Sequence, residues 1–223
     1  MNYRILIAGL CTLFLLSACG VGVPSSKISY SSGEQQAIRQ EVVDQVNENA
    51  DPYDVLALYE KLIDFDEVNS ESRQLALHYV LDANWALVTE KKGEEALALA
   101  MELDKLLPGD FYVQNRILGA YRVMAEKAIE EKKYDRAYDL LFNTALKIRF
   151  DAEVMRTYLH LRTVMAQEAI ALKDYETARS YLSDVELIAS IDENAGLYDD
   201  EKAEAERLLK TLPPAPAGSE GEQ

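Results

Sequence analysis

The sequence has few of the side chains that bind metals or form cross-links. Its 223 residues include two cysteines, Cys11 and Cys19, and two histidines, His78 and His160, which are far apart in the chain. Two cysteines cannot form a disulfide framework or a cysteine-rich zinc site, and two distant histidines are a poor basis for a histidine metal site. We therefore expect no bound metal and no cofactor.

Basic residues are also scarce. The chain has 23 Lys and Arg against 39 Asp and Glu, a formal net charge of -16. Nucleic acid binding needs a basic face that neutralises phosphates, and anionic lipid attracts the same residue types. The charge therefore argues against nucleic acid as a partner and against electrostatic docking on anionic lipid. The 48% of apolar residues argues equally against a disordered chain.

No apolar run is long enough to span a bilayer. Residues 5–16 form an almost wholly apolar run of twelve residues that follows a single positive charge at Arg4. A helix of this length rises about 18 Å, against about 30 Å of hydrocarbon. A positive start, a short apolar stretch and the small residues Ser17 and Ala18 describe a secretory signal peptide. We expect residues 1–18 to be removed by cleavage after Ala18.

The residues at the end of this segment, Leu16-Ser17-Ala18-Cys19, resemble the lipobox of bacterial lipoproteins. The resemblance implies that Cys19 is acylated, becomes the first residue of the mature chain and anchors it in a lipid membrane. In that family, the absence of Asp at the next position, here Gly20, favours the periplasmic face of the outer membrane in a Gram-negative host. The alternative is an ordinary secretory signal with a Cys at the cut by chance. On the lipoprotein interpretation no free thiol remains for catalysis.

Flexible segments are expected on both sides of the main body. Residues 19–33 combine the lipidated Cys with a tether rich in Gly and Ser, and residues 212–223 form a Pro/Gly/acidic tail that we expect to be disordered. Across residues 34–211 apolar residues recur at three- and four-residue spacing, which predicts an all-α domain. The expected helices are 34–48, 52–64, 71–91, 94–106, 111–131, 134–148, 152–172, 175–189 and 199–211.

Part of this domain repeats itself. Residues 123–141 and 164–182 agree at nine of nineteen positions when the first segment is aligned directly on the second. Residues 82–100, which lie one such interval before residues 123–141, agree with them at five of nineteen positions. A single helix pair cannot bury its apolar face alone, so neighbouring pairs must stack into a solenoid. The sequence thus predicts a helical-repeat solenoid of antiparallel helix pairs with a 41-residue period.

The units resemble tetratricopeptide repeats. The resemblance rests on a small residue in the first helix, a Tyr at the turn and an Ala that opens the second helix, which are Ala125, Tyr134 and Ala137 in one unit. It covers about residues 77–190 and implies that the first helix of each pair lines a concave groove. The usual period of that family is about 34 residues, so these units are longer by about two helical turns. Armadillo-like and HEAT-like pairs have a period closer to this one but lack this arrangement.

No motif of a known catalytic site is present. The sequence contains no glycine-rich phosphate loop, no GxSxG and no HExxH. Residues 192–196 begin like a calcium loop, but Leu197 occupies the position of the obligatory Gly. We therefore expect a protein that is not an enzyme and has no catalytic residues.

The tetratricopeptide resemblance also implies which side chains face the groove. Trp85 is the only Trp of the chain, and Trp and Arg are the residue types that most often anchor interfaces. The alternative is that Trp85 packs between helices and that the two histidines are ordinary surface or packing residues. The residues expected to bind a partner in the groove are His78, Leu81, Trp85, Thr89, Tyr121, Arg122, Glu126, Glu130, His160, Thr163, Gln167 and Ala171.

Three functions remain as hypotheses at this point. The first is an outer-membrane-anchored, non-enzymatic scaffold that holds a segment of another envelope protein during assembly of secretion, pilus, outer-membrane or cell-wall machinery, with basic partners favoured. The second is a solute-binding lipoprotein that delivers a small ligand to a transporter, with Trp85, Tyr121 and Arg122 around an enclosed pocket. The third is an envelope enzyme, which needs paired carboxylates in a cleft.

Overall fold

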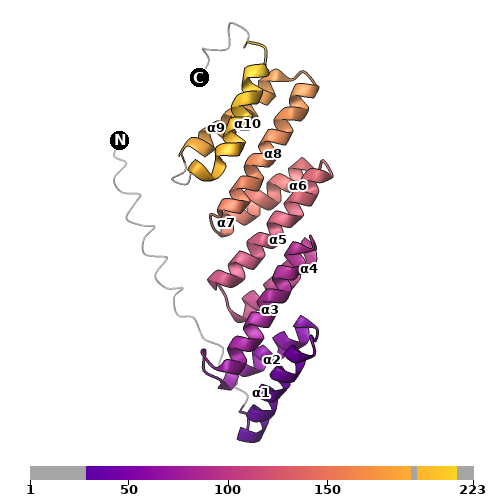
Figure 1. The fold of residues 1–223 in the computed structure, drawn as a ribbon, viewed down its shortest axis with the longest axis vertical. Helices are drawn as coiled ribbons and strands as arrows, with labels where there is room; N and C mark the ends of the chain where they lie inside the picture. Colours follow the sequence, from indigo (N-terminus) through magenta and orange to yellow (C-terminus); the bar gives the residue numbers. More distant parts are fainter. Residues whose placement is uncertain (1–28, 192–194, 215–223) are drawn as a thin grey trace, which may run out of the picture.

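The described part of the protein is entirely helical (Figure 1). The computed structural model describes residues 29–191 and 195–214. The all-α prediction is confirmed over these residues. The helices are α1 (Ser32–Asn47), α2 (Pro52–Phe65), α3 (Glu71–Thr89), α4 (Gly93–Leu106), α5 (Phe111–Glu130), α6 (Tyr134–Tyr138), α7 (Leu146–Ile148), α8 (Ala152–Ala171), α9 (Tyr175–Ile191) and α10 (Asp199–Thr211), with a π-helical stretch at Asp139–Ala145 and a 3₁₀ turn at Ala195–Tyr198.

Several predictions fall partly or wholly on residues that the structure does not describe. The signal peptide, its cleavage after Ala18, the acylated Cys19 and most of the tether lie outside the described residues, as does the tail from residue 215 onward. Helix α1 begins two residues earlier than expected, so the last two residues of the predicted tether are helical. The physical reason is a capping box in which Ser31 and Glu34 hydrogen-bond each other's backbone N–H groups.

Polar side chains begin most of the helices. Asp51 accepts a hydrogen bond from the N–H of Tyr53, and Pro52 follows it at the first helical position, where a missing N–H is tolerated. Asp110 and Asp151 each accept hydrogen bonds from two N–H groups of the helix that follows. These caps fix where α2, α5 and α8 begin, at the first residues of the expected helices 52–64, 111–131 and 152–172.

The helices stack into an elongated body, with α1 at one end and α10 at the other (Figure 1). Most helices pack on their neighbours in the chain, and α3, α5, α8 and α10 also pack on one another in that order. The two larger clusters of buried apolar residues are centred on α1 to α5 and on α5 to α10, and Tyr121 of α5 packs against both. A small third cluster joins α3, α4 and α5. Helix α5 therefore joins the two halves of the core.

Small residues allow the helices to approach closely. The alanines that agree between the sequence units, Ala125 with Ala166 and Ala137 with Ala178, are all fully buried. A buried Ala keeps the backbones of two helices close, because no longer side chain separates them. Their burial explains why small residues recur at these positions.

Three lysines end the long helices in a conformation that favours glycine. Lys91, Lys132 and Lys173 follow α3, α5 and α8, and their φ angles are +60°, +59° and +62°. Helices α3, α5 and α8 therefore end one or two residues earlier than the expected ranges 71–91, 111–131 and 152–172. The sequence carries no Gly or Asn at these three positions to indicate a left-handed turn.

We expect Lys173→Gly to raise the free energy of unfolding by about 1 kcal/mol, because glycine adopts the left-handed region without a Cβ clash. Lys173 forms none of the ion pairs found among the described residues, unlike Lys91 and Lys132, so its charge contributes little there. The measurement is chemical denaturation followed by circular dichroism. Ala171→Gly, at an exposed position in the last turn of the same helix, is the control and should lower stability by about 0.5–1 kcal/mol. Equal effects of the two changes would contradict the assignment of strain to Lys173.

Candidate functional site

The residues expected in the groove lie on three helices that pack in succession, α3, α5 and α8. They contribute to two separate cavities, and to a smaller hollow of about 190 Å³ lined by His160 and Thr163, rather than to one continuous surface. His78 and Leu81 line the first, which has a volume of about 440 Å³. Arg122, Glu126 and His160 line the second, of about 390 Å³. We call them the α3–α5 cavity and the α5–α8 cavity.

The α3–α5 cavity combines arginines with apolar and aromatic walls. Arg73 of α3 and Arg116 of α5 both line it, and Asp82 and Asp110 are the acidic residues on its wall. Asp110 already accepts the N–H groups that begin α5. The remaining lining residues are Tyr59, Val68, Gln74, Leu77, His78, Leu81, Leu107 and Tyr112.

Trp85 lies next to this cavity, on α3. Its side chain is 49% exposed, so it is not packed away between helices. The guanidinium carbon of Arg116 lies 5.1 Å from the centroid of the Trp85 ring, in a cation–π contact. Trp85 therefore presents a large apolar surface to solvent beside an arginine, as residues that anchor interfaces do.

Both arginines that line the α5–α8 cavity are already paired with glutamates. The guanidinium of Arg122 lies 2.5 Å from the carboxylate of Glu126, one turn further along α5. Arg156 of α8 lies 2.9 Å from Glu153 and 3.5 Å from Glu201, the latter on α10. Only the Arg156–Glu201 pair joins two helices, α8 and α10, and together the pairs leave neither arginine free for a ligand.

Other residues expected in the groove have different surroundings. Leu81 lines the α3–α5 cavity but belongs mostly to the core, and Tyr121 is half-buried against both apolar clusters. Thr163 is buried and donates its hydroxyl proton to the carbonyl of Leu159. Gln167 is exposed and donates to Glu204 of α10 at 3.4 Å. The repeat phase thus selected residues on helices that pack on one another, but it did not separate exposed from buried positions on them.

Arg73 and Arg116 are not among the site residues that the sequence predicted. Both lie in the first half of their helices, before the residues that repeat phase selects. They are not at equivalent positions in the units, because the residue one period after Arg73 is Gln114. Only the packing of α3 on α5 brings the two arginines to one cavity, and their spacing in the sequence does not predict this contact.

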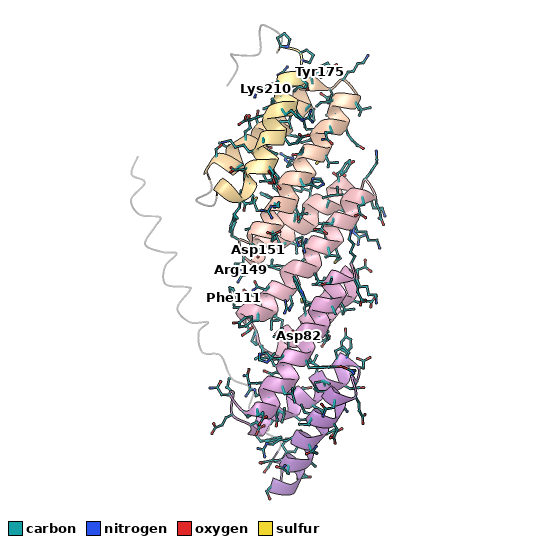
Figure 2. All side chains as sticks on the ribbon, in the orientation of Figure 1. Asp82, Phe111, Arg149, Asp151, Tyr175 and Lys210 are labelled. Carbon is teal, nitrogen blue, oxygen red and sulfur yellow. The ribbon has the colours of Figure 1, made fainter. Side chains whose placement is uncertain are left out.

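A second exposed apolar patch lies at the starts of α5 and α8. Phe111, Tyr112 and Phe150 are each about half exposed or more. Figure 2 shows Arg149 beside Phe111, and the guanidinium carbon lies 4.3 Å from the centroid of that ring. Arg149 also lies 4.0 Å from the carboxylate of Asp151. The patch is therefore partly covered by a cation that is itself held in place.

Within residues 29–191 and 195–214, no group of His, Cys, Asp and Glu side chains is arranged to hold a metal ion. Among the same residues, no helix is both long and apolar enough to cross a lipid bilayer. Comparisons with protein-family models, with curated proteins and with solved structures find no match to this chain.

Proposed function

We propose that the chain is a lipid-anchored, non-enzymatic adaptor built as a tetratricopeptide-like solenoid. The positions of the helices support the repeat. Helices α4, α6 and α9 begin at residues 93, 134 and 175, and the left-handed lysines lie at 91, 132 and 173, so both sets follow the 41-residue period. The elongated stack in Figure 1 is consistent with such an arrangement, in which each pair buries its apolar face on the next.

The anchor is proposed on the Leu16-Ser17-Ala18-Cys19 motif. Two or three acyl chains on Cys19 would hold the protein at a membrane almost permanently, because each buried CH₂ contributes about 0.8 kcal/mol. The absence of Asp at Gly20 favours the periplasmic face of the outer membrane. The partner is then another protein of the cell envelope.

One observation carries the adaptor proposal. The only Trp of the chain is half exposed on α3, one of the helices expected to line the groove, and it stacks on an arginine of the next such helix. Exposed aromatic and Arg side chains beside a cavity are typical of sites that bind a peptide segment or a helix. The α3–α5 and α5–α8 cavities lie on the same succession of helices as two separate hollows.

A solute-binding lipoprotein is the second candidate. The observation that favours it is the size of the α3–α5 cavity, since about 440 Å³ lies within the range of about 300–1,000 Å³ found for small-molecule sites. This candidate predicts that a small molecule, and no protein, is recovered with the purified chain. The experiment that follows separates the two.

We expect crosslinking in intact cells followed by purification of the acylated chain to recover one envelope protein, identified by mass spectrometry. Trp85→Ala combined with Arg122→Ala should reduce its recovery at least tenfold, because one change removes the exposed ring and the other breaks the pair with Glu126.

The control for that experiment is Met101→Ala with Arg207→Ala. It removes an exposed apolar side chain and an arginine paired along its own helix, as the test variant does, but neither residue lines either cavity. The control should leave recovery unchanged, and circular dichroism should show the same helix content in all three proteins. Recovery of no envelope protein, or equal loss in both double variants, would contradict the adaptor proposal.

A further inference from the structure

The α3–α5 cavity contains arginines without carboxylate partners, which is unusual in this chain. Acidic residues outnumber basic ones by 39 to 23, so a guanidinium normally finds a carboxylate close by. The arginines that do so are Arg39, Arg122, Arg136, Arg149, Arg156, Arg162 and Arg207. Within the described part of the chain, Arg73, Arg116 and Arg179 form no ion pair, and the first two line the same cavity.

Arg73 is the more deeply placed of the two. Only 9% of this residue is exposed, and its guanidinium carbon lies 5.7 Å from the centroid of the Tyr59 ring. One terminal nitrogen donates to the carbonyl of Asp66 at 3.3 Å, whereas the buried Nε–H has no acceptor among the described residues. A buried guanidinium with an unused donor costs free energy unless an acceptor is supplied.

Arg116 of α5 also lines the cavity, and its guanidinium carbon lies over the ring of Trp85. Its Nε–H is also buried and lacks an acceptor in the described structure. Burial lowers the pKa of the Arg116 guanidinium, and the negative charge of Asp82 offsets this only in part. Asp82 forms no ion pair with it, and Asp110, the other carboxylate of the wall, caps α5.

The rest of the wall suits an apolar side chain. Leu77, Leu81 and Leu107 line the cavity together with Tyr59 and Tyr112. The ligand therefore has an anionic group for the arginines and an apolar group beside it. A planar carboxylate matches the geometry of guanidinium donors, and arginine binds it with two parallel hydrogen bonds.

We propose that the α3–α5 cavity binds an acidic peptide segment, in which the carboxylate of an Asp or Glu lies between Arg73 and Arg116 and a neighbouring apolar side chain contacts Trp85 and the leucines. This names the chemistry of the partner and rests on the proposed adaptor function. It also replaces the expectation that the negative net charge selects a basic partner. The whole chain is acidic, but this cavity presents two arginines that form no ion pair.

The test uses the single Trp as a reporter, since all Trp fluorescence of the full chain comes from Trp85 beside the cavity. Peptides are first selected from a random twelve-residue library on the full-length chain in mild detergent. We expect enrichment of Asp or Glu next to Leu, Ile or Phe. The best peptide should change the Trp85 emission in a saturable way, and its Asn/Gln analogue should bind at least tenfold more weakly.

Arg116→Met should weaken binding of the selected peptide at least tenfold, and Arg116→Lys should restore part of the affinity because it keeps the charge. Arg207→Met, on α10, is the matched control and should bind as the unchanged chain does. Raising the salt concentration should weaken binding to the unchanged chain more than to Arg116→Met.

A library selection with no enrichment of acidic residues, or enrichment of Lys and Arg, overturns the proposal. Equal binding by Arg116→Met and the unchanged chain also overturns it. If the crosslinked envelope protein is still recovered in either case, the adaptor function stands and only the acidic chemistry is wrong. If neither a peptide nor a protein partner is recovered, both proposals fail.

Discussion

Leu159→Ala should lower the free energy of unfolding by about 2–5 kcal/mol, the range for truncating a fully buried Leu. Leu159 has no exposed surface and lies in the cluster that packs α5, α8 and α9 together. Removing three carbons leaves a cavity that the surrounding helices cannot fill completely. The measurement is chemical denaturation of the full chain followed by circular dichroism.

Leu172→Ala is the matched control for this change. Leu172 follows the end of the same helix and is 80% exposed, so its truncation should alter stability by less than about 0.5 kcal/mol. Similar losses from the two variants would show that α8 does not bury the face assigned to it. The repeat aligns Leu159 with Leu118, which is also buried, and with Leu77, which is partly buried.

Gly93→Ala is expected to destabilise the protein by about 1–3 kcal/mol. A Cβ built at Gly93 would lie 2.6 Å from the Cγ of Met124 and 3.1 Å from the carbonyl oxygen of Ala120. Both neighbours belong to α5, so the first residue of α4 must lack a side chain for the two helices to pack as they do. The change should lower the denaturation midpoint although alanine is the better helix former.

Gly119→Ala, in the same region, is expected to change stability in the opposite direction. Gly119 lies inside α5, and an added Cβ would only touch the methyl groups of Val88 at 3.7 Å. We expect this change to raise stability by up to about 1 kcal/mol, because alanine loses less backbone entropy in a helix. Two changes of the same sign would contradict the close approach of α4 to α5.

Much of the helical framework could be predicted from the sequence, because its signals are local. The periodic apolar residues placed the helices to within about two residues, and side-chain caps such as those of Asp51 and Asp151 fix where α2 and α8 begin. The π-helical stretch at Asp139–Ala145 could not be predicted, since the residues there keep an ordinary helical pattern. The positive φ angles of Lys91, Lys132 and Lys173 could not be predicted either, because nothing in a lysine side chain favours the left-handed region.

The candidate site was less predictable because it depends on contacts between helices. The repeat assigned Arg122 and His160 to the groove, and both line the α5–α8 cavity. It could not show that Arg122 and Arg156 are each already paired with a glutamate. It also could not show that Leu81, which lines the α3–α5 cavity, is only 6% exposed. The stacking of Arg116 on Trp85 joins residues 31 positions apart, and it follows from the register of α3 against α5.

The central claim is that the surface around Trp85 binds another protein of the cell envelope. Its most direct test is to place a photoreactive phenylalanine analogue at position 85 of the acylated chain in intact cells and irradiate them. Position 101 on α4, where the native Met101 is exposed and outside both cavities, serves as the reference. The adaptor account predicts one crosslinked envelope protein from position 85 and none from position 101. No crosslink from position 85, or the same products from both positions, would contradict it.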